Sequence, residues 1–353
     1  MKTLTVALPG RDYDILIERG LLERVGELCK AALPRARKLA VVTDANVGPI
    51  YADRVKAGLE AAGFAVQVTT LPAGEHTKCV ENLSALWETF RAFGLTRTDA
   101  VVALGGGVIG DLAGFAASTV LRGVDFVQIP TTLLAQVDSS VGGKVAIDLK
   151  AGKNLAGAFW QPRLVLMDPN VLETLDNKTF SDGMAEVIKY GCIRDAEFFS
   201  FLEQHPSRRE IMAEIEHVLY TCCNLKREVV VEDERDTGMR MLLNFGHTLG
   251  HAYELAGNYE VWTHGQAVAA GMVKAAGLGL TLDMTPAGTA ERITALLNCF
   301  HLPITIDCTH EQYADAVGLD KKGAGDNISL ILLKAIGSAI AHKMPKAEVL
   351  NLL

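Results

Sequence analysis

Two histidines, His247 and His251, lie four residues apart in the stretch from Leu243 to His251. On an α-helix this spacing places both imidazoles on one face, one turn apart, and Asn244 falls about a turn earlier on that face. A polar row of this kind inside an apolar segment can hold a metal ion or bind an anionic substrate. The alternative is a pair of solvated or hydrogen-bonded histidines, so residues elsewhere in the chain have to decide between the two interpretations.

Three residues that are distant in the sequence could together bind a divalent cation. Glu186 is a carboxylate among apolar helix residues, where burial requires a partner. His247 belongs to the stretch above, and His264 directly precedes a very apolar segment. One carboxylate and two imidazoles leave coordination positions open, as in a catalytic zinc site. Taken singly, each could instead be a buried polar group with an ordinary partner.

Basic residues accumulate near these candidates although the formal net charge of the chain is -8. Lys189 follows Glu186 by one helical turn, Lys226 lies in a predicted helix, and Arg240 extends the polar row before His247. Such a row could bind a small polyanion. The alternative is a charged, solvent-exposed side of a helix.

Length and composition limit the classes of protein to consider. At 353 residues, with 49% apolar and 22% charged residues, the chain exceeds one ordinary hydrophobic core and predicts two domains. The negative charge argues against a nucleic-acid-binding or membrane-surface protein. The seven cysteines form no C-x-x-C pair, the amino terminus lacks the apolar core of a signal peptide, and the apolar stretch 328–341 is interrupted by Lys334. We therefore expect a soluble, cytoplasmic protein with reduced thiols.

The amino-terminal half alternates strand and helix patterns. Two strands, 3–8 and 13–18, form a predicted hairpin. The other predicted strands are 38–44, 64–70, 100–104 and 125–129. Helices are predicted over 21–32, from the end of the strand 38–44 up to residue 63, and over 80–93. Strands separated by helices of this length are typical of a parallel sheet with crossover helices.

Glycines in Gly105–Asp111 directly follow a predicted strand. Glycines at a strand-to-helix turn allow backbone N–H groups to approach a pyrophosphate, which the amino terminus of the next helix also attracts. Ligands of open α/β sheets bind at the carboxyl ends of the strands, where Asp44, the loop 72–78, Thr131 and Thr132 should also lie. We interpret this crevice as a dinucleotide site. The alternative is a tight turn that only allows close packing of helix on strand.

In the segment from Gln136 to Asp148, the paired glycines Gly142-Gly143 are flanked by short polar residues and are predicted to form a loop. Cations follow where an acidic protein has no general need for them. We expect Lys144 and Lys153 to contact an anion, and Lys150 to be a solvated surface residue.

From about Pro169 strand patterns nearly vanish and helical patterns predominate. The predicted helices are 181–190, 196–202, 208–230, 242–255, 265–282 and 287–297. The chain is therefore predicted to combine an α/β domain over residues 1–170 with a mainly helical domain over residues 171–353, linked through 168–180.

Four of these segments resemble the signature sequences of the 3-dehydroquinate synthase family. They are Gly105–Asp111, Pro130–Lys144, Gly183–Lys189 and Leu243–Thr248. The resemblance extends from about Thr43 to Leu333, and the segment ending at Lys144 is highly specific. It implies a Rossmann-like, parallel-sheet NAD-binding α/β domain followed by a mainly helical metal- and substrate-binding domain, in agreement with the patterns above.

The resemblance implies a carbon–oxygen lyase that converts 3-deoxy-D-arabino-heptulosonate 7-phosphate to 3-dehydroquinate and phosphate in the shikimate pathway. A hydroxyl is oxidised by NAD, phosphate leaves by β-elimination, the ketone is reduced again, and an intramolecular aldol step closes the carbocycle. The implied cofactors are NAD and one divalent metal ion, zinc or cobalt. The implied partner, besides the phosphorylated sugar acid, is a second copy of the chain in a homodimer.

The resemblance also assigns roles to individual residues. The metal ligands would be Glu186, His247 and His264. The phosphate would lie among Lys144, Asn154, Asn244 and His251, with Lys189 nearby and Arg122 reaching across the dimer interface. The carboxylate and ring hydroxyls would be bound by Arg240 and Lys226, Asp138 is a further catalytic candidate, and the candidates for relaying the hydroxyl proton are His251 and Lys189. The NAD-binding residues would be Asp44, Gly74, Glu75, Lys78, Gly107, Val108, Ile109, Gly110, Asp111, Thr131, Thr132, Lys144, Lys153, Val171, Leu172, Glu173 and Thr174.

Two positions depart from the family pattern. Asp176–Thr179 replaces a segment that contains proline and Arg-Glu, which could change the connection between the domains. Gln266 replaces a glutamate two residues after the third metal ligand, which removes a charge near the metal.

Three other functions are compatible with parts of this pattern. Another sugar-phosphate cyclase would share the fold and the metal ligands, but Asn244, His251 and Arg240 favour a substrate with both phosphate and carboxylate. A metal-dependent polyol dehydrogenase would not need these groups and would release NADH. A regulatory dinucleotide-binding protein would have no use for the three metal positions.

Overall fold

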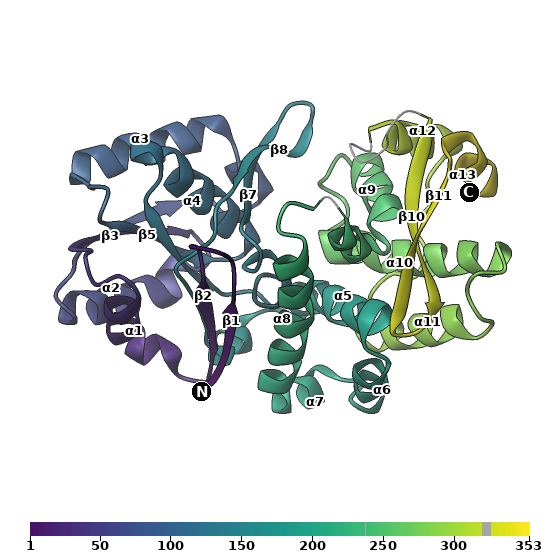
Figure 1. The fold of residues 1–353 in the computed structure, drawn as a ribbon, viewed down its shortest axis with the longest axis horizontal. Helices are drawn as coiled ribbons and strands as arrows, with labels where there is room; N and C mark the ends of the chain where they lie inside the picture. The colour runs from purple at the N-terminus through teal and green to yellow at the C-terminus, as the bar shows by residue number, and fades with distance from the viewer. Residues whose placement is uncertain (237, 320–325) are drawn as a thin grey trace. The chain divides into compact units, whose positions relative to one another are not determined.

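The structure, a computed structural model, describes residues 1–236, 238–319 and 326–353. It divides into two compact units, each made of two stretches of chain (Figure 1). Unit 1 comprises Met1–Leu175 and Lys226–Arg235, and unit 2 comprises Asp176–Leu225 and Asp236–Leu353. The chain thus returns to unit 1 at Lys226–Arg235, and the single division predicted after residue 170 does not include this return.

A seven-stranded sheet forms the centre of unit 1, in the order β1-β2-β9-β6-β5-β3-β4. Its strands are β1 Lys2–Val6, β2 Tyr13–Ile17, β3 Lys38–Asp44, β4 Ala65–Leu71, β5 Ala100–Gly105, β6 Asp125–Pro130 and β9 Leu164–Met167. Strand β1 pairs antiparallel with β2, and the other neighbours are parallel. The predicted parallel sheet is therefore confirmed. Strand β9 was not predicted, because four consecutive apolar residues are too few to show a period.

Helices cover both faces of this sheet, α1 and α2 on one side and α3 and α4 on the other (Figure 1). Their bounds are α1 Val25–Ala32, α2 Gly48–Ala61, α3 Val80–Phe93 and α4 Gly107–Thr119. Phe90 of α3 and Leu112 of α4 pack with Val101 of β5 in one buried cluster. Strands that are covered on both faces lose the alternation of polar and apolar residues, which explains the continuous apolar runs of β3 and β5.

A second, two-stranded sheet in unit 1 was not predicted. Strands β7 Lys144–Leu149 and β8 Gly152–Phe159 pair antiparallel. The predicted loop at Gly142-Gly143 lies directly before β7, after a π-helical turn, Ala135–Ser139. Small residues hide the strand pattern: a Cβ at Gly157 would overlap the backbone oxygen of Val145 across the hairpin.

Unit 2 is mainly helical, as predicted. Its helices are α5 Asn177–Arg194, α6 Ala196–Gln204, α7 Arg208–Ala213, α8 Ile215–Glu232, α9 His247–Ala256, α10 His264–Thr281, α11 Thr289–Cys299, α12 His310–Leu319 and α13 Lys346–Leu352, the end of α8 belonging to unit 1. A hairpin of β10 Asn327–Ala335 and β11 Ser338–Pro345 corrects the expectation that strands nearly vanish here. The apolar run of β10 lies within the stretch 328–341, whose only sequence interpretation is a candidate membrane span that Lys334 interrupts.

Two predicted helices of unit 2 are interrupted. The helix predicted over 208–230 consists of α7 and α8, which Glu214 separates. The helix predicted over 242–255 consists of a 3-10 helix, Met239–Asn244, and then α9. Gly246 breaks it with a φ of 78°, a conformation that favours glycine. The polar row from Arg240 to His251 therefore does not lie on one continuous helix.

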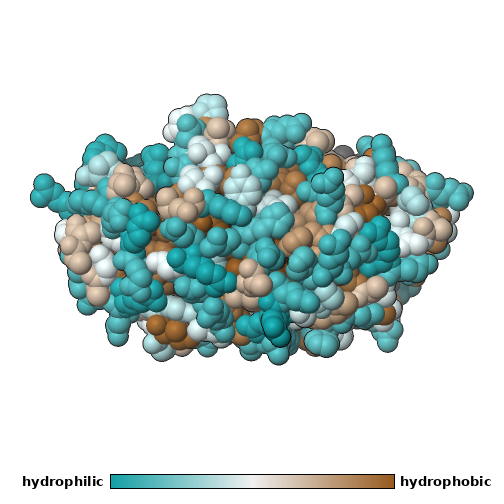
Figure 2. All heavy atoms as spheres, turned by 90° about the horizontal axis from the view of Figure 1, so that it is seen from below, coloured by the Kyte–Doolittle hydropathy of each residue, from teal (hydrophilic) through white to brown (hydrophobic). Residues whose placement is uncertain are grey.

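Polar and charged residues cover most of the molecular face in Figure 2. Among the residues that the structure describes, no helix has both the length and the apolar character needed to cross a membrane. All seven cysteines are free thiols.

Candidate active site

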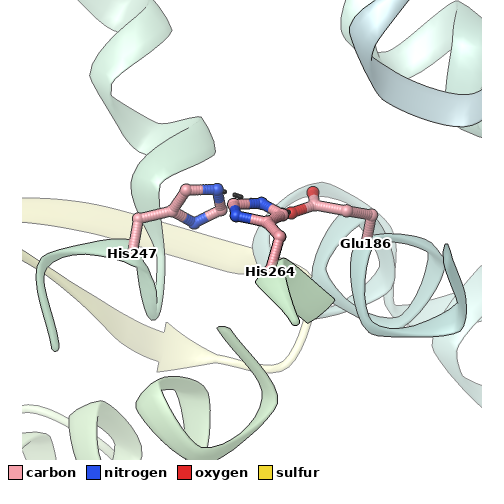
Figure 3. A group of neighbouring side chains, drawn as sticks. All are labelled: Glu186, His247 and His264. Atoms are coloured by element: carbon pink, nitrogen blue, oxygen red, sulfur yellow. Dashed lines mark hydrogen bonds and ion pairs between the residues drawn. The ribbon is translucent and has the colours of Figure 1, made fainter. Parts of the chain in front are cut away.

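The side chains of Glu186, His247 and His264 point toward one another (Figure 3). They belong to three different helices: Glu186 lies within α5, His247 begins α9 and His264 begins α10. Glu186 Oε1 lies 3.4 Å from His247 Nε2 and 3.2 Å from His264 Nε2. One possible ligand atom from each residue lies within 4.8 Å of the others. The structure thus brings the three predicted metal ligands together.

Both imidazoles turn the same nitrogen toward Glu186. The opposite nitrogen of His247, Nδ1, lies 3.2 Å from the backbone oxygen of Phe245. Nδ1 of His264 lies 3.6 Å from Glu254 Oε1. A proton on each Nδ1 would face an oxygen and leave both Nε2 atoms as electron-pair donors, the usual arrangement of metal-binding histidines.

The electrostatic surroundings of the two imidazoles differ. Glu186 is fully buried and forms an ion pair with Lys189. Burial, together with the Lys189 ammonium, lowers the pKa of His247 to about 3, so this imidazole is neutral. Burial also works to lower the pKa of His264, but hydrogen bonds to Glu186 and Glu254 outweigh it and raise the pKa well above its ordinary value. One carboxylate oxygen and two imidazole nitrogens fit zinc or cobalt.

A close contact between α5 and α10 sets the position of His264. The backbone N–H of Gly265 donates to Asp182 Oδ1 at 2.7 Å. A Cβ at Gly265 would overlap the backbone oxygen of Asp182, so α10 can begin this close to α5 only with glycine at this position. Asp182 precedes Glu186 by one turn of α5, and the contact therefore holds two ligands in register.

Helices α9 and α10 also approach closely through glycines. A Cβ at Gly271 would overlap the backbone oxygen of Gly246, the residue directly before His247. At Gly246 itself, a Cβ would lie 2.8 Å from the backbone oxygen of Val268. The start of α9, with its histidine, is thereby fixed against α10.

At both departures from the family pattern, a side chain caps a helix that carries a candidate metal ligand. Gln266 Oε1 accepts a hydrogen bond from the Thr263 N–H at 3.1 Å, as part of a capping box at the start of α10. Asp176 Oδ1 accepts one from the Thr179 N–H at 2.7 Å and caps α5. Gln266 and Asp176 therefore each stabilise the start of a helix through a capping hydrogen bond.

The remaining predicted residues of unit 2 are His251, Arg240 and Asn244. His251 follows His247 by one turn of α9, with ring centroids 5.8 Å apart, and its side chain is 63% exposed. Arg240 is buried, and Asn244 ends the 3-10 helix before α9.

In unit 1, the predicted dinucleotide residues gather at the carboxyl ends of the strands. The Thr131 N–H donates to the backbone oxygen of Gly105 at 3.0 Å, which joins the ends of β5 and β6. A Cβ at Gly106 would lie 3.1 Å from Thr132 Cγ2. Helix α4 begins directly afterwards, so the backbone N–H groups of Gly107–Asp111 form its first turns beside the two threonines.

Lys78 joins three further parts of the predicted site. It is buried, and its Nζ lies 2.9 Å from Asp111 Oδ2, 2.5 Å from Asn154 Oδ1 and 3.3 Å from Glu75 Oε1. Burial works to lower its pKa, but the carboxylates, Asp111 foremost, outweigh it and raise the pKa above the ordinary value. Burial raises the pKa of Asp111 despite this ammonium. The network connects the loop after β4, the start of α4 and the β7–β8 hairpin.

Other predicted residues of unit 1 occupy separate positions. Asp44 ends β3 and accepts hydrogen bonds from the N–H groups of the next turn. The 3-10 helix Pro169–Thr174, which contains the predicted residues Val171 to Thr174, contacts α2: Tyr51 Oη lies 2.9 Å from Thr174 Oγ1. Lys144 begins β7, and Lys153 lies in β8.

The buried Lys226 pairs with Asp138, which is half-buried. Lys226 Nζ donates to the backbone oxygen of Asp138 at 2.7 Å and to its Oδ1 at 2.8 Å. Arg122 is exposed and has a φ of 67°.

Two carboxylates of the metal cluster were missed in the sequence. Asp182 lies four residues before Glu186, and Glu254 lies three residues after His251. Both spacings correspond to one helical turn from a predicted residue, which is the signal that could have found them. Glu254 is buried beside His264.

Comparisons with solved structures define the class of protein. A 2-deoxy-scyllo-inosose synthase, solved with carbaglucose-6-phosphate, NAD+ and Co2+, is 26% identical, with a TM-score of 0.89 and coverage of 99% of both chains. The 2-epi-5-epi-valiolone synthase from Streptomyces hygroscopicus, with NAD+ and Zn2+ bound, is 27% identical, with a TM-score of 0.88 over 96% of this chain and 95% of that one. The fold is that of the sugar-phosphate cyclases.

Sequence comparisons are more specific. The family model described as 3-dehydroquinate synthase N-terminal matches residues 68–182, and the one described as 3-dehydroquinate synthase C-terminal matches residues 183–323. The 3-dehydroquinate synthase of Clostridium beijerinckii is 49% identical over 345 residues, which cover 97% of this chain and 98% of that protein. The chain belongs to the 3-dehydroquinate synthase family.

Proposed function

We propose that the chain converts 3-deoxy-D-arabino-heptulosonate 7-phosphate to 3-dehydroquinate and phosphate. Membership of the family supports the reaction. The observation that carries the proposal is the convergence of Glu186, His247 and His264 on one point in a chain that also has a glycine-rich turn at the end of β5. The first feature suits a catalytic metal and the second a dinucleotide.

Unit 1 would bind NAD, which accepts a hydride from the substrate and later returns it. The N–H groups at the start of α4 would hold the pyrophosphate, since they point away from the helix and carry its positive dipole end. Asp44, at the end of β3, would accept hydrogen bonds from a ribose, as an acidic residue does in many dinucleotide sites. The network around Lys78 would fix the loop after β4 against α4 as one edge of the site.

Unit 2 would hold a zinc or cobalt ion through Glu186 Oε1 and the Nε2 atoms of His247 and His264, and this ion would polarise the reacting hydroxyl and ketone. Lys189 forms an ion pair with the buried Glu186. His251 is exposed one turn from His247, where its imidazole could bind the substrate phosphate or carry the hydroxyl proton at Nε2. Arg240 and Asn244 would add hydrogen-bond donors for the carboxylate and phosphate.

Phosphate release tests this proposal. The chain is incubated with the heptulosonate phosphate, a catalytic amount of NAD and Zn2+ or Co2+, and both phosphate and NADH absorbance are followed. We expect one phosphate per substrate without accumulation of NADH. A Glu186→Gln variant should release none, whereas Glu203→Gln, which alters an exposed ion pair with Arg292, should equal the wild type. Phosphate no faster than with Glu186→Gln would contradict the proposal, and stoichiometric NADH would indicate a dehydrogenase instead.

We further propose that the chain acts as a homodimer in the cytoplasm. In support, Leu121 is 41% exposed although apolar, and both Leu121 and Arg122 have positive φ values, which is uncommon for residues other than glycine. A turn of this kind is suited to packing against a second copy. Sedimentation equilibrium should give twice the mass of the chain, and a monomer at all concentrations would contradict the dimer.

A further inference from the structure

Glu254 is a buried carboxylate next to the candidate metal ligands. It lies near the end of α9 and is 2% exposed. Its Oε1 lies 3.6 Å from Nδ1 of His264, and its Oε2 lies 4.0 Å from Nε2 of His251. A carboxylate at this depth requires charged or hydrogen-bonding neighbours. The two histidines provide them, one facing each oxygen.

His264 is the ligand that packing restrains least. The side chain of Glu186 is 0% exposed, that of His247 is 12% exposed, and that of His264 is 32% exposed. His247 also has the backbone oxygen of Phe245 beside its Nδ1. The corresponding neighbour of His264 is the side chain of Glu254, so a single substitution can remove it.

The charges around the site also favour a role for Glu254 in metal binding. Glu186 is already in contact with the ammonium of Lys189, so its negative charge is largely compensated before a metal ion arrives. Glu254 supplies a second buried negative charge on the far side of His264. A carboxylate behind a metal-binding imidazole fixes the tautomer and the ring orientation and makes the ligand nitrogen a stronger donor.

We propose that Glu254 is a positioning residue: it holds the Nδ1 side of His264 and thereby directs Nε2 toward the point shared with Glu186 and His247. This proposal rests on the proposed function only in assuming that these three residues bind a divalent cation. It concerns binding of the ion and not the chemistry of the substrate.

Titration of the metal-free full chain with Co2+, without NAD or substrate, tests the proposal. The visible absorption band reports the ligand geometry, and competition with a chelator gives the affinity. We expect Glu254→Gln to weaken Co2+ binding about 10- to 100-fold and to change the band. The matched control is Tyr253→Phe, because it removes the adjacent buried group of α9, a hydroxyl that lies 3.0 Å from Tyr313 Oη. Its affinity and band should equal those of the wild type.

A conservative variant separates charge from loss of folding. Glu254→Asp keeps the carboxylate on a shorter side chain, and we expect its affinity for Co2+ to lie between those of the wild type and Glu254→Gln. Thermal unfolding of each protein shows whether the variant is folded. If both variants bind Co2+ within twofold of the wild type and with the same band, the role of Glu254 is overturned while the proposed function stands. If the wild-type chain binds no Co2+, the metal site and this inference both fail.

Discussion

The candidate cofactor region of unit 1 and the candidate metal centre of unit 2 are built in different ways. The first uses contiguous residues at the carboxyl ends of neighbouring strands, Gly105–Asp111 and Thr131-Thr132. The second uses single side chains from three helices, Glu186, His247 and His264. The backbone of a regular sheet supplies the first arrangement. The second depends on close helix contacts at particular glycines, of which Gly246 and Gly265 directly adjoin the ligands His247 and His264 in the sequence.

The largest effect on stability is expected at Lys78, which holds the edge of the cofactor region. Lys78→Met leaves Asp111 and Glu75 without their buried cation, and removing one partner of a buried pair costs about 3–5 kcal/mol. Urea unfolding measures the loss. Lys150→Met, on the exposed turn of the β7–β8 hairpin, is the control and should change stability by less than about 0.5 kcal/mol. A loss below about 1 kcal/mol for Lys78→Met would mean that this network does not organise the region.

A smaller loss of stability, but a specific loss of metal binding, is expected at Gly265. The added Cβ of Gly265→Ala overlaps the backbone oxygen of Asp182 and moves the start of α10, with His264, away from α5. We expect about 1–3 kcal/mol of destabilisation and weaker binding of Co2+ in a spectroscopic titration.

Gly277→Ala provides the comparison for this variant in the same helix. Among the described residues, apart from the chain neighbours of Gly277 and the adjoining backbone of α10, no atom lies within 4 Å of a Cβ placed at Gly277. This substitution should be neutral or should stabilise the helix by about 0.5–1 kcal/mol, with metal affinity unchanged. Equal effects at the two glycines would refute the idea that close contact with α5 positions His264.

The smallest effect is expected at Asp99 and depends on pH. Its Oδ1 accepts hydrogen bonds from the N–H groups of Arg37 and Lys38 at 3.0 and 2.9 Å, so it holds the starts of β3 and β5. Burial works to raise its pKa, but the hydrogen bonds, that of the Thr96 side chain first, outweigh it and lower the pKa. The stabilisation is therefore complete above the unfolded pKa of about 4 and is lost as the pH falls through the lower folded pKa.

Asp99→Asn should consequently lose about 1–2 kcal/mol at pH 7, and the difference from the wild type should shrink as the pH falls below about 4. Urea unfolding at several pH values measures this, and metal binding at pH 7 should not change. A difference that grows toward low pH would contradict the assigned sign.

The same contrast between the regions explains what the sequence could predict. The parallel sheet and the residues at its strand ends were predicted because apolar runs, helices and glycine turns follow one another locally. The β7–β8 hairpin was missed because alanine and glycine, such as Gly157, weaken its strand pattern. The break at Gly246 was missed because an isolated glycine is tolerated in helices, and its cause, the approach of α10, is a tertiary contact.

For the candidate metal centre, the residue types were predictable and the geometry was not. Residue type and apolar surroundings singled out Glu186, His247 and His264 as candidates. Only the resemblance to the family assigned them to one metal ion, since no spacing connects residues so far apart. The sequence places Asp182 and Glu254 one helical turn from predicted residues, but their contacts with Gly265 and His264 join different helices and required the structure.

The central claim is that Glu186 Oε1 and the Nε2 atoms of His247 and His264 bind one divalent cation. The most direct test is a crystal structure of the zinc-loaded protein with anomalous diffraction recorded at the zinc edge. We predict one anomalous peak among these three atoms, at about 2.0–2.1 Å from each. A zinc peak elsewhere, or none at this point in protein that releases phosphate, would contradict the account.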